Sequence, residues 1–472
     1  MESRTAGVGV QDMMRAREAR AQAQRMLLMR HPGAVVVGLT MNIAGPVKTN
    51  AAIERAFAWG EACVRAVLAA HEVPFAHAIH EVTGPEALFC VHADAAELKR
   101  RLCALEDGCA MGRLLDIDVI GADGMKLSRT DVGLHARRCL LCGRPAPECA
   151  RSRTHSAQEL FARALEIIAA HEEEAFVRRV GEQAQQALLS EVAVTPKPGL
   201  VDRANAGAHR DMDVFTFVRS ACVLRPYFEQ CARTGLAHRN GDAAACFDAL
   251  RVPGLLAEAD MRAATGGVNT HRGAIFSLGI LCAALGMGFD PERCDAEAAL
   301  VRCGEMTCAR MALEMKSARP DAPRYGEALC ARQGVGGVRK EAAEGFPAVR
   351  EAALPRLRAA LAAGMSVNDA GLCTLAALMA RTEDTNAIRR GGMEAARALR
   401  ERAQALDVRL YAAMSAPGFD AQAEGEGLRR ELAAWDAELI AANISPGGCA
   451  DMLALAFLAH GMEEPLSPRP AY

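Results

Sequence analysis

Two aspartates in the first third of the chain have the spacing of metal ligands in a phosphoryl-transfer site. The segment Gly112–Gly121 alternates apolar and polar residues, so a strand there would place Asp116 and Asp118 on its polar face. Two residues of strand rise about 6.6 Å, and two carboxylates at that separation can hold one or two Mg²⁺ ions against a triphosphate. The same pattern also fits a half-exposed strand with two solvated carboxylates.

A Gly-Pro turn earlier in the chain supplies candidate phosphate contacts. The segment Asn42–Lys48 directly follows the predicted strand Ala34–Met41, so Asn42 and Lys48 lie at a strand end, where a loop can meet a phosphate. Taken by itself, the segment is an ordinary turn.

Three cysteines and a histidine follow with the spacing C-x2-C-x6-C-x5-H, and their types suit a tetrahedral Zn²⁺ site. The spacing is unusual for a zinc finger. The alternative is a reduced loop whose flanking arginines bind phosphate. The sequence leaves both readings open. The four candidate ligands are Cys139, Cys142, Cys149 and His155, and the arginines are Arg137, Arg138, Arg151 and Arg153.

The second half of the chain contains three polar, glycine-rich or proline-rich loops. In Glu191–His209, prolines end a helix and leave polar side chains in an irregular segment. Thr265–Gly273 and Ser445–Gly448 each open a predicted helix, whose first N–H groups can bind a phosphate, although glycines there are often simple caps. The candidate phosphate or substrate contacts are Lys197, Arg203, Asn205, Gly266, Gly267, Asn269, Thr270, Arg272, Ser445, Gly447, Gly448 and Asp451.

Several titratable residues in or near these loops are candidates for acid, base or metal-binding roles. His271 lies within a glycine-rich loop, whereas most carboxylates on helices are only solvated charges. Neither glycine-rich loop has the Walker spacing, and no G-x-G-x-x-G follows a strand, which disfavours the usual nucleotide-binding folds. The candidate catalytic residues are Asp202, Glu258, His271 and Asp384, with Asp260 and Glu383 beside them.

The pattern of elements changes along the chain and predicts two domains. Strand-like runs at Ala34–Met41 and Ala87–His92, with a helical period from Ile53 to Leu68 between them, continue the alternation up to about residue 120, which predicts an α+β domain. After about residue 156 the chain is almost entirely helical in pattern. We place the boundary near residue 172, giving domains 1–171 and 172–472, and expect an exposed helix at His171–Glu174.

Composition narrows the class of protein. The chain has 472 residues, 51% apolar and 24% charged, with a net charge of −3, so it is expected to be an ordinary soluble protein without attraction to nucleic acid. The uncharged run Gly273–Phe289 is shorter than the about 20 apolar residues that span a membrane, and we expect a buried helix. The first thirty residues lack an export signal, so a cytoplasmic location with mostly reduced cysteines is expected.

The motifs of the first part together resemble a known family. REAR at Arg17–Arg20, NIAGPVK at Asn42–Lys48, GRLLDIDVI at Gly112–Ile120 and RRCLLCGRPAPECARSRTH at Arg137–His155 are similar to the citrate lyase holo-acyl carrier protein synthases. One departure is Ala44, where the family usually has proline. The resemblance implies a nucleotidyltransferase-like domain in which a serine of the carrier protein, the gamma subunit of citrate lyase, attacks the α-phosphate of a triphosphoribosyl donor. Asp116 and Asp118 would hold Mg²⁺, and the other phosphate oxygens would meet Lys48, Arg113, Arg137 and Arg138.

The second part resembles the triphosphoribosyl-dephospho-coenzyme A synthases. TPKPGLVDRANAGAHRDMD, LRVPGLLAEADMRAATGGVNTHRGAIFSLG, RTEDTNAIRRGG and ISPGGCADMLALA occur in the order of that family. The resemblance implies an all-helical enzyme in which the ribose 2′-hydroxyl of 3′-dephospho-coenzyme A attacks C1′ of ATP and adenine leaves. Arg272, Lys197 and Arg203 would bind phosphates. The metal ligand or base would be Glu258, Asp384 or Asp451, a choice that the sequence leaves open.

The two resemblances support each other, because the product of the second domain is the donor for the first. The chain is therefore expected to be a bifunctional transferase with Mg²⁺ as its expected cofactor. Two alternatives remain: the equivalent enzymes of malonate decarboxylase, and a zinc-dependent interaction protein without catalysis. The sequence leaves open the oligomeric state and transfer of the intermediate between domains.

Overall fold

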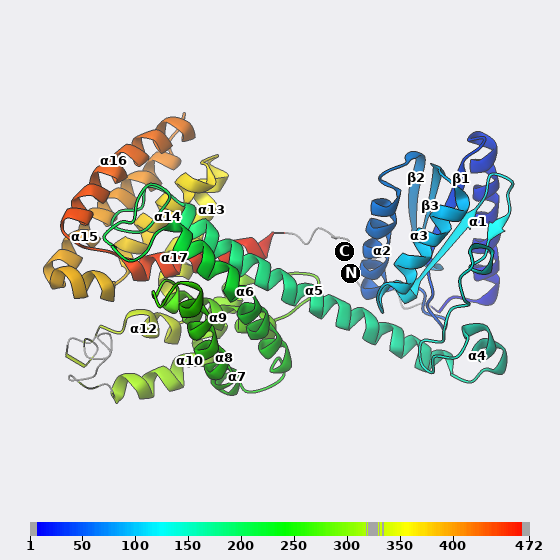
Figure 1. Ribbon diagram of the computed structural model, residues 1–472, viewed down its shortest axis with the longest axis horizontal. Helices are drawn as coiled ribbons and strands as arrows, with labels where there is room; N and C mark the ends of the chain where they lie inside the picture. The colour runs from blue at the N-terminus through cyan, green and yellow to red at the C-terminus, as the bar shows by residue number, and fades with distance from the viewer. Residues whose placement is uncertain (1–6, 318, 320–328, 330, 333–334, 465–472) are drawn as a thin grey trace. The chain divides into compact units, whose positions relative to one another are not determined.

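The computed structural model describes residues 7–317, 319, 329, 331–332 and 335–464. The chain divides into two compact units, of which the first extends to Glu174 and the second begins at Ala175 (Figure 1). The division falls within one long helix, α5 (Ala157–Ala193), which contributes to both units. The predicted layout of a mixed first part and a helical second part is confirmed.

The first unit is built on a five-stranded antiparallel sheet with the strand order β2-β3-β1-β4-β5. The alternating segments predicted as strands form β1, β3 and β4, and the expected helix between them forms α2. The elements of this unit are α1 (Val10–Arg30), β1 (Val35–Met41), α2 (Ala51–Leu68), β2 (Glu72–Glu81), β3 (Gly84–His92), α3 (Ala95–Asp107), β4 (Leu115–Ile120), β5 (Lys126–Leu127) and α4 (Ala146–Ser152), with short 3₁₀ turns at Gly112–Leu114 and Thr130–Val132.

The two faces of this sheet have different environments. Val37, Leu39 and Ile117 belong to the main core with α2, α3 and the start of α5. On the opposite face, Val36 joins a smaller cluster with Leu27 of α1. The side chains of β4 alternate between buried and more exposed positions, as the sequence predicts. The aspartates of β4 therefore lie on the face opposite the main core.

The region predicted as an exposed connecting helix packs against α2 instead. Glu172 accepts a hydrogen bond from Arg55 Nε at 2.7 Å, and the ring of His171 lies edge-on to Trp59 at 4.9 Å between centroids. The prediction is therefore wrong for these two residues, since an ion pair and a ring contact hold them against the first unit.

The second unit is helical throughout the part of the chain that the structure describes, apart from its connecting loops. A short π-helical turn at Val349–Ala353 precedes α13, and α15 is interrupted at Gly392, whose φ of 79° is not helical. Besides α5, its helices are α6 (Val214–Ala237), α7 (Ala243–Ala249), α8 (Arg251–Ala264), α9 (Arg272–Met287), α10 (Ala296–Lys316), α12 (Gly337–Ala343), α13 (Leu354–Ala362), α14 (Val367–Arg381), α15 (Thr385–Met414), α16 (Ala421–Ala441) and α17 (Gly447–Glu463).

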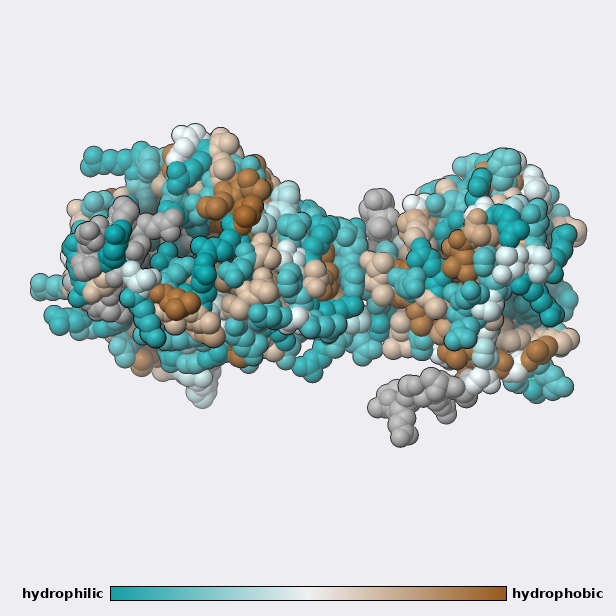
Figure 2. Space-filling view, turned by 90° about the horizontal axis from the view of Figure 1, so that it is seen from below, coloured by the Kyte–Doolittle hydropathy of each residue, from teal (hydrophilic) through white to brown (hydrophobic). Residues whose placement is uncertain are grey.

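The uncharged segment forms a helix at the centre of this unit. Almost every residue of α9 after Gly273 is buried, which confirms the predicted buried helix. None of the helices in the described ranges has the length and apolarity needed to cross a membrane. Polar side chains cover most of the face drawn in Figure 2, where apolar side chains form small patches.

Glycines allow α6 and α9 to approach closely. A Cβ added at Gly235 of α6 would overlap the Ala283 carbonyl oxygen, and one added at Gly286 of α9 would overlap the Ala232 carbonyl oxygen. The close packing of these two helices therefore requires residues without a Cβ atom at both positions.

Gly235→Ala is expected to lower the free energy of unfolding of the second unit by about 1–3 kcal/mol, because the two helices must separate. Gly427→Ala is the matched control: a Cβ there meets nothing within 4 Å, and alanine should raise the helix stability by up to about 1 kcal/mol. Urea unfolding can be followed by the fluorescence of Trp435 in a Trp59→Phe background. Equal effects of the two substitutions would contradict the close packing.

Candidate active sites

Polar side chains form a row on the face of the first unit's sheet that lies opposite the main core. Thr40 of β1 pairs with Asp116 of β4 on one side and with Glu86 of β3 on the other. Two residues after Asp116, on the same face of β4, Asp118 forms an ion pair with Lys126 at 2.6 Å. Arg20 of α1 lies 3.3 Å from the Glu86 carboxylate. The row thus combines three carboxylates with basic side chains, a composition suited to a metal-bound phosphate.

A buried carboxylate holds Arg137 beside this row. Glu106 of α3 is almost fully buried, and it accepts hydrogen bonds from the Ile117 N–H at 2.9 Å and from Arg129 at 3.0 Å. Arg137 also pairs with Glu106 and reaches within 3.7 Å of Asp116. Burial raises the pKa of Glu106, an effect that the charge of Arg137 opposes. Glu106 therefore fixes both strand β4 and the arginine.

A cleft of about 530 Å³ brings together most of the residues predicted to bind phosphate in this unit. Arg113 lines it and donates a hydrogen bond to the Arg138 carbonyl, while its buried Nε has no partner among the described residues. Asp116 and Asp118 are outside this lining, although Arg137 connects Asp116 to it. The predicted residues in the lining are Asn42, Arg113, Arg137, Arg138, Cys139, Cys149, Arg153 and His155.

Lys48 lies apart from this lining. Its ammonium donates a hydrogen bond to the Ile43 carbonyl, and burial together with the charge of Arg17 lowers its pKa. Its placement therefore suits stabilisation of the Gly-Pro turn, and the structure offers no support for the predicted phosphate contact.

The cysteine and histidine motif folds into one compact group, here called the Cys3His cluster. The sulfur atoms and one ring nitrogen all lie within 4.8 Å of one another. Each of the sixteen cysteines in the described residues is free. The cluster consists of Cys139, Cys142, Cys149 and His155.

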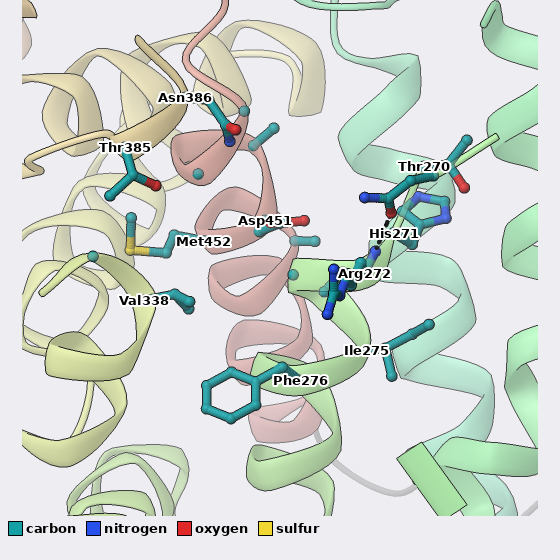
Figure 3. A pocket seen from close by; sticks show the side chains of 18 of the residues that line it. Thr270, His271, Arg272, Ile275, Phe276, Val338, Thr385, Asn386, Asp451 and Met452 are labelled. Atoms are coloured by element: carbon teal, nitrogen blue, oxygen red, sulfur yellow. Dashed lines mark hydrogen bonds between the residues drawn. The ribbon is translucent and has the colours of Figure 1, made fainter. Parts of the chain in front are cut away.

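The second unit has a larger cleft, of about 990 Å³, at which the starts of three long helices meet. The first residues of α9, α15 and α17 line it, so the positive ends of these three helices favour an anion. Figure 3 shows Asp451 projecting from α17 toward the start of α9, where Arg272 and His271 lie. The cationic residues of the lining are Arg251, Arg272, Arg339, Arg389 and Arg390.

Three carboxylates lie close enough to influence one another in this cleft. Burial, followed by the charges of Glu191 and Asp384, raises the pKa of Asp451 well above its usual value. Asp384 accepts hydrogen bonds from the N–H groups of Asn386 at 2.8 Å and Cys449 at 3.0 Å, so it joins the starts of α15 and α17. Burial raises the pKa of Asp384 as well, against the effect of these hydrogen bonds.

His271 is buried and electrically neutral. Its Nδ1 lies 2.6 Å from the Ser220 hydroxyl, and its Nε2 is buried with no hydrogen-bond partner in the part of the chain that the structure describes. Burial and the charge of Lys197 lower its pKa to about 3. The imidazole can therefore donate or accept a hydrogen bond in the cleft, but it cannot supply a proton as an imidazolium ion at neutral pH.

The structure brings some of the remaining predicted residues to the cleft. Glu258 lies 3.2 Å from the Arg272 guanidinium, and both line the cleft together with the loop before α9. Asp260, two residues after Glu258 in α8, is exposed and outside the lining. The predicted residues in the lining are Glu258, Asn269, Thr270, His271, Arg272, Glu383, Asp384, Ser445, Gly447, Gly448 and Asp451.

Other predicted residues have structural contacts outside the lining. Lys197 is 1% exposed and pairs with Glu191, so it compensates a buried charge and has no free ammonium for a phosphate. Asp202 accepts hydrogen bonds from the backbone N–H of Lys197 and from the Thr195 hydroxyl, both at 2.8 Å. Arg203 donates to the Ala193 carbonyl. Lys197 therefore has a structural role in place of the predicted phosphate contact, whereas the phosphate role of Arg203 and the catalytic role of Asp202 stay predictions.

Three further residues of the predicted set also lie outside the lining. Asn205 donates a hydrogen bond to Asp436 at 2.8 Å. Gly266 and Gly267 are exposed, and their positive φ angles of 66° and 91° form the turn before α9. Their contribution is to the backbone path that brings Asn269 and Thr270 to the cleft.

Sequence reasoning missed several residues of both sites. Glu86 precedes the predicted strand Ala87–His92 by one residue, and Glu106 lies on a helix where a carboxylate is usually solvated. In the second unit, Glu191 and the pair Arg389 and Arg390 lay inside quoted motifs or loops, but their types alone gave no reason to select them. Only the fold shows which of them face the cleft.

Comparison with known proteins decides the family. Residues 8–171 match the model of the CitX family, apo-citrate lyase phosphoribosyl-dephospho-CoA transferase. Residues 177–470 match the model of the CitG family, ATP:dephospho-CoA triphosphoribosyl transferase. The "Protein CitXG" of Haemophilus influenzae is 33% identical over 468 residues, which cover 95% of each chain. The chain belongs to the CitXG family.

Two further relatives of this CitXG chain support the assignment. The "Protein CitXG" of Leuconostoc mesenteroides subsp. cremoris is 33% identical over 388 residues, covering 80% of this chain and 82% of the relative. The "2-(5''-triphosphoribosyl)-3'-dephosphocoenzyme-A synthase" of Pectobacterium atrosepticum is 40% identical over 299 residues, covering 62% of this chain and 92% of the relative. The predicted resemblance to both families is confirmed.

The buried neutral His271 makes a testable contribution to pH-dependent stability. Its pKa is lower in the folded chain than the usual 6.5, so the unfolded chain binds the proton more readily and stability is lost as the pH falls below 6.5. Between pH 7.5 and pH 5.5, protonation of this single group in the unfolded chain should lower the free energy of unfolding by about 1.4 kcal/mol. Urea unfolding at both pH values, followed by Trp435 fluorescence in a Trp59→Phe background, measures it.

His271→Gln should reduce the loss of stability on acidification by that amount relative to wild type. Val408→Ala, at an exposed position of α15 without a titratable group, is the control and should keep the wild-type dependence. The same pH dependence in all three proteins would contradict a neutral His271.

Proposed function

We propose that this chain makes the triphosphoribosyl-dephospho-coenzyme A precursor from ATP and 3′-dephospho-coenzyme A and then transfers the prosthetic group to the citrate lyase acyl carrier protein. The observation that carries the proposal is the match of both families on one chain, since the product of one reaction is the substrate of the other. The two clefts support it, because each combines cationic side chains with nearby carboxylates.

In the second unit, the larger cleft would bind the two nucleotides. The helix starts and the arginines of the lining can hold the triphosphate and the diphosphate of dephospho-coenzyme A. Asp384 and Asp451 are the candidates for Mg²⁺ binding, because burial raises the pKa of each and neither forms an ion pair within the described residues, whereas Glu191 is already compensated by Lys197. A bound Mg²⁺ would neutralise part of the triphosphate charge.

Asp451 is the best candidate for the base that accepts the ribose 2′-hydroxyl proton. Burial raises its pKa well above the usual value, which makes the carboxylate more basic, and its side chain projects toward the start of α9, where Arg272 lies. The carboxylate of Asp384 is occupied by three backbone N–H groups, and Glu258 is paired with Arg272. The free Nε2 of His271 can hydrogen-bond the leaving adenine or the ribose.

In the first unit, the carrier serine would attack the α-phosphate and pyrophosphate would leave. Asp116 and Asp118 would hold Mg²⁺, and Glu86 completes the carboxylate row. Arg113 and Arg137 can stabilise the charge that develops on the phosphate oxygens. The antiparallel sheet with its two strand aspartates supports a nucleotidyltransferase-like domain.

The two activities are assigned to residues 1–171 and 172–472. The compact units and the two matched ranges support this division. We propose a cytoplasmic location, where ATP is available and thiols stay reduced, and the carrier protein as the macromolecular partner.

Two other functions are less well supported. The related maturation enzymes of malonate decarboxylase build the same group, but the first unit matches a family described for citrate lyase. A zinc-dependent interaction protein without catalysis would leave the larger cleft and its charged lining without a role.

Asp116→Asn should lower the rate of attachment to the carrier by at least about 100-fold, because it removes a proposed Mg²⁺ ligand. Adenine release from ATP and dephospho-coenzyme A should stay at the wild-type rate. Glu166→Gln, an exposed carboxylate paired with Arg163 on α5, is the control and should keep both activities. The carrier is analysed by intact mass and adenine by chromatography. Loss of adenine release in Asp116→Asn would contradict separate sites.

Asp451→Asn should have the reverse effect. Adenine release should fall by about 10²–10⁴-fold, because the proposed base is lost. Attachment should proceed normally when the donor has been made beforehand by the wild-type chain. Asp260→Asn, exposed on α8, is the control for a lost surface carboxylate. Unchanged adenine release in Asp451→Asn would remove this residue from the mechanism.

A further inference from the structure

We propose that the Cys3His cluster binds one structural Zn²⁺ ion, which fixes the arginine segment that lines the smaller cleft. Zinc binding itself is independent of the proposed function. The effect of zinc on attachment to the carrier rests on the proposed function of the first unit.

The positions of the ligand atoms fit a single tetrahedral ion. With Zn–S bonds of about 2.3 Å and a Zn–N bond of about 2.1 Å, the ligand atoms of such a site lie roughly 3.5–3.8 Å apart. All four candidate atoms lie within 4.8 Å of one another, so small side-chain shifts complete the geometry. Among the described residues, this is the one group of three or more His, Cys, Asp or Glu side chains with such spacing.

The backbone around the first two cysteines forms a tight turn that presents both sulfur atoms to one side. Arg138 pairs with Pro145 across the turn, and Cys139 N–H donates to the Arg144 carbonyl at 2.7 Å. Gly143 directly after the second cysteine has a φ of 70°, which favours glycine. The Leu141 N–H points at the first sulfur, at 3.5 Å, as a donor to a metal-bound thiolate would.

The other two ligands come from the short helix α4 and the turn after it. Cys149 lies within α4, and Arg153 ends the helix with a left-handed φ of 48°. That turn brings His155 back toward the sulfur atoms. The His155 Nε2 is buried and has no hydrogen-bond partner among the described residues. A buried polar atom without a partner costs about 1–3 kcal/mol, and this nitrogen lies in a group of three thiols, where a metal ion would satisfy it.

A disulfide explains the cluster less well. The sulfur atoms of Cys142 and Cys149 are 3.3 Å apart, compared with about 2.05 Å in a disulfide. A disulfide would also leave the sulfur of Cys139 and the ring of His155 without a role. Zn²⁺ uses all four residues, and four protein ligands leave no open position, which is the pattern of structural zinc sites.

The location of the cluster indicates what the ion stabilises. Cys139, Cys149 and His155 line the same cleft as Arg137 and Arg138, which directly precede the first ligand. Three thiolates and one Zn²⁺ carry a net charge of −1. This negative charge offsets part of the positive charge of the arginines in the same short segment. Loss of the ion should therefore release the arginines that contact the donor phosphates.

Metal analysis of the wild-type full-length chain, purified in reducing buffer without chelator, is the first test. The expected content is about one Zn²⁺ per chain. Replacement by Co²⁺ should give the absorption bands of a tetrahedral thiolate-bound ion. These two measurements need no variant, so they test the proposal even where a substitution prevents folding.

Variants then locate the ion. Cys142→Ser and His155→Ala should each lower zinc retention by at least about tenfold after gel filtration. Cys222→Ser, an exposed cysteine of the second unit, is the matched control and should retain it. Carrier attachment should fall with the zinc content. Adenine release, which uses the other unit, should be unchanged and shows that the second unit of the variant is folded.

Two results would overturn the proposal. One is a wild-type chain that holds less than about 0.1 Zn²⁺ even after incubation with equimolar zinc and gel filtration. The other is a disulfide between Cys142 and Cys149 in protein purified anaerobically. Zinc that is bound equally by wild type, Cys142→Ser and His155→Ala would likewise exclude the cluster as its site.

Discussion

The compensation of buried negative charge at Glu191, Asp384 and Asp451 is the constraint on which the larger cleft depends. Lys197 is placed in the interior to pair with Glu191, and Asp384 is held by the first N–H groups of α15 and by Cys449 of α17. These contacts hold the first residues of α15 and α17 at the larger cleft. Asp451 receives less compensation, and its raised pKa leaves a carboxylate able to take a proton.

The first unit also contains a buried carboxylate whose negative charge must be compensated. Glu106 is buried under the sheet and binds both the backbone of β4 and the side chain of Arg137. One carboxylate thereby fixes the strand that carries Asp116 and the arginine that approaches it. The charge of Arg137 opposes the burial effect on Glu106, and Arg129 also pairs with this carboxylate, so loss of Glu106 would remove a buried partner from both arginines.

Elements with a strong pattern could be predicted from the sequence, and those that depend on tertiary pairing could not. The alternation around Asp116 and Asp118 predicted β4 and its polar face, and the uncharged run predicted the buried helix α9. The edge strand β2 gave no such signal, because most of its side chains are exposed and alternate weakly.

The candidate sites show the same division. The resemblance to the synthase family implied that Arg272, Asp384 and Asp451 belong to one site, and all three line the larger cleft. Lys197 was misjudged, because a lysine between two prolines suggests an exposed loop, whereas its partner Glu191 holds it in the interior. Glu106 was missed for the same reason: burial and pairing are properties of the fold.

The central claim is that one polypeptide both makes and attaches the prosthetic group. The most direct measurement supplies the wild-type chain with ATP, Mg²⁺, 3′-dephospho-coenzyme A and apo acyl carrier protein, and follows the intact mass of the carrier together with free adenine and pyrophosphate. The account predicts a carrier heavier by one phosphoribosyl-dephospho-coenzyme A group, with adenine and pyrophosphate released in equal amounts. An unmodified carrier together with absent adenine would contradict it.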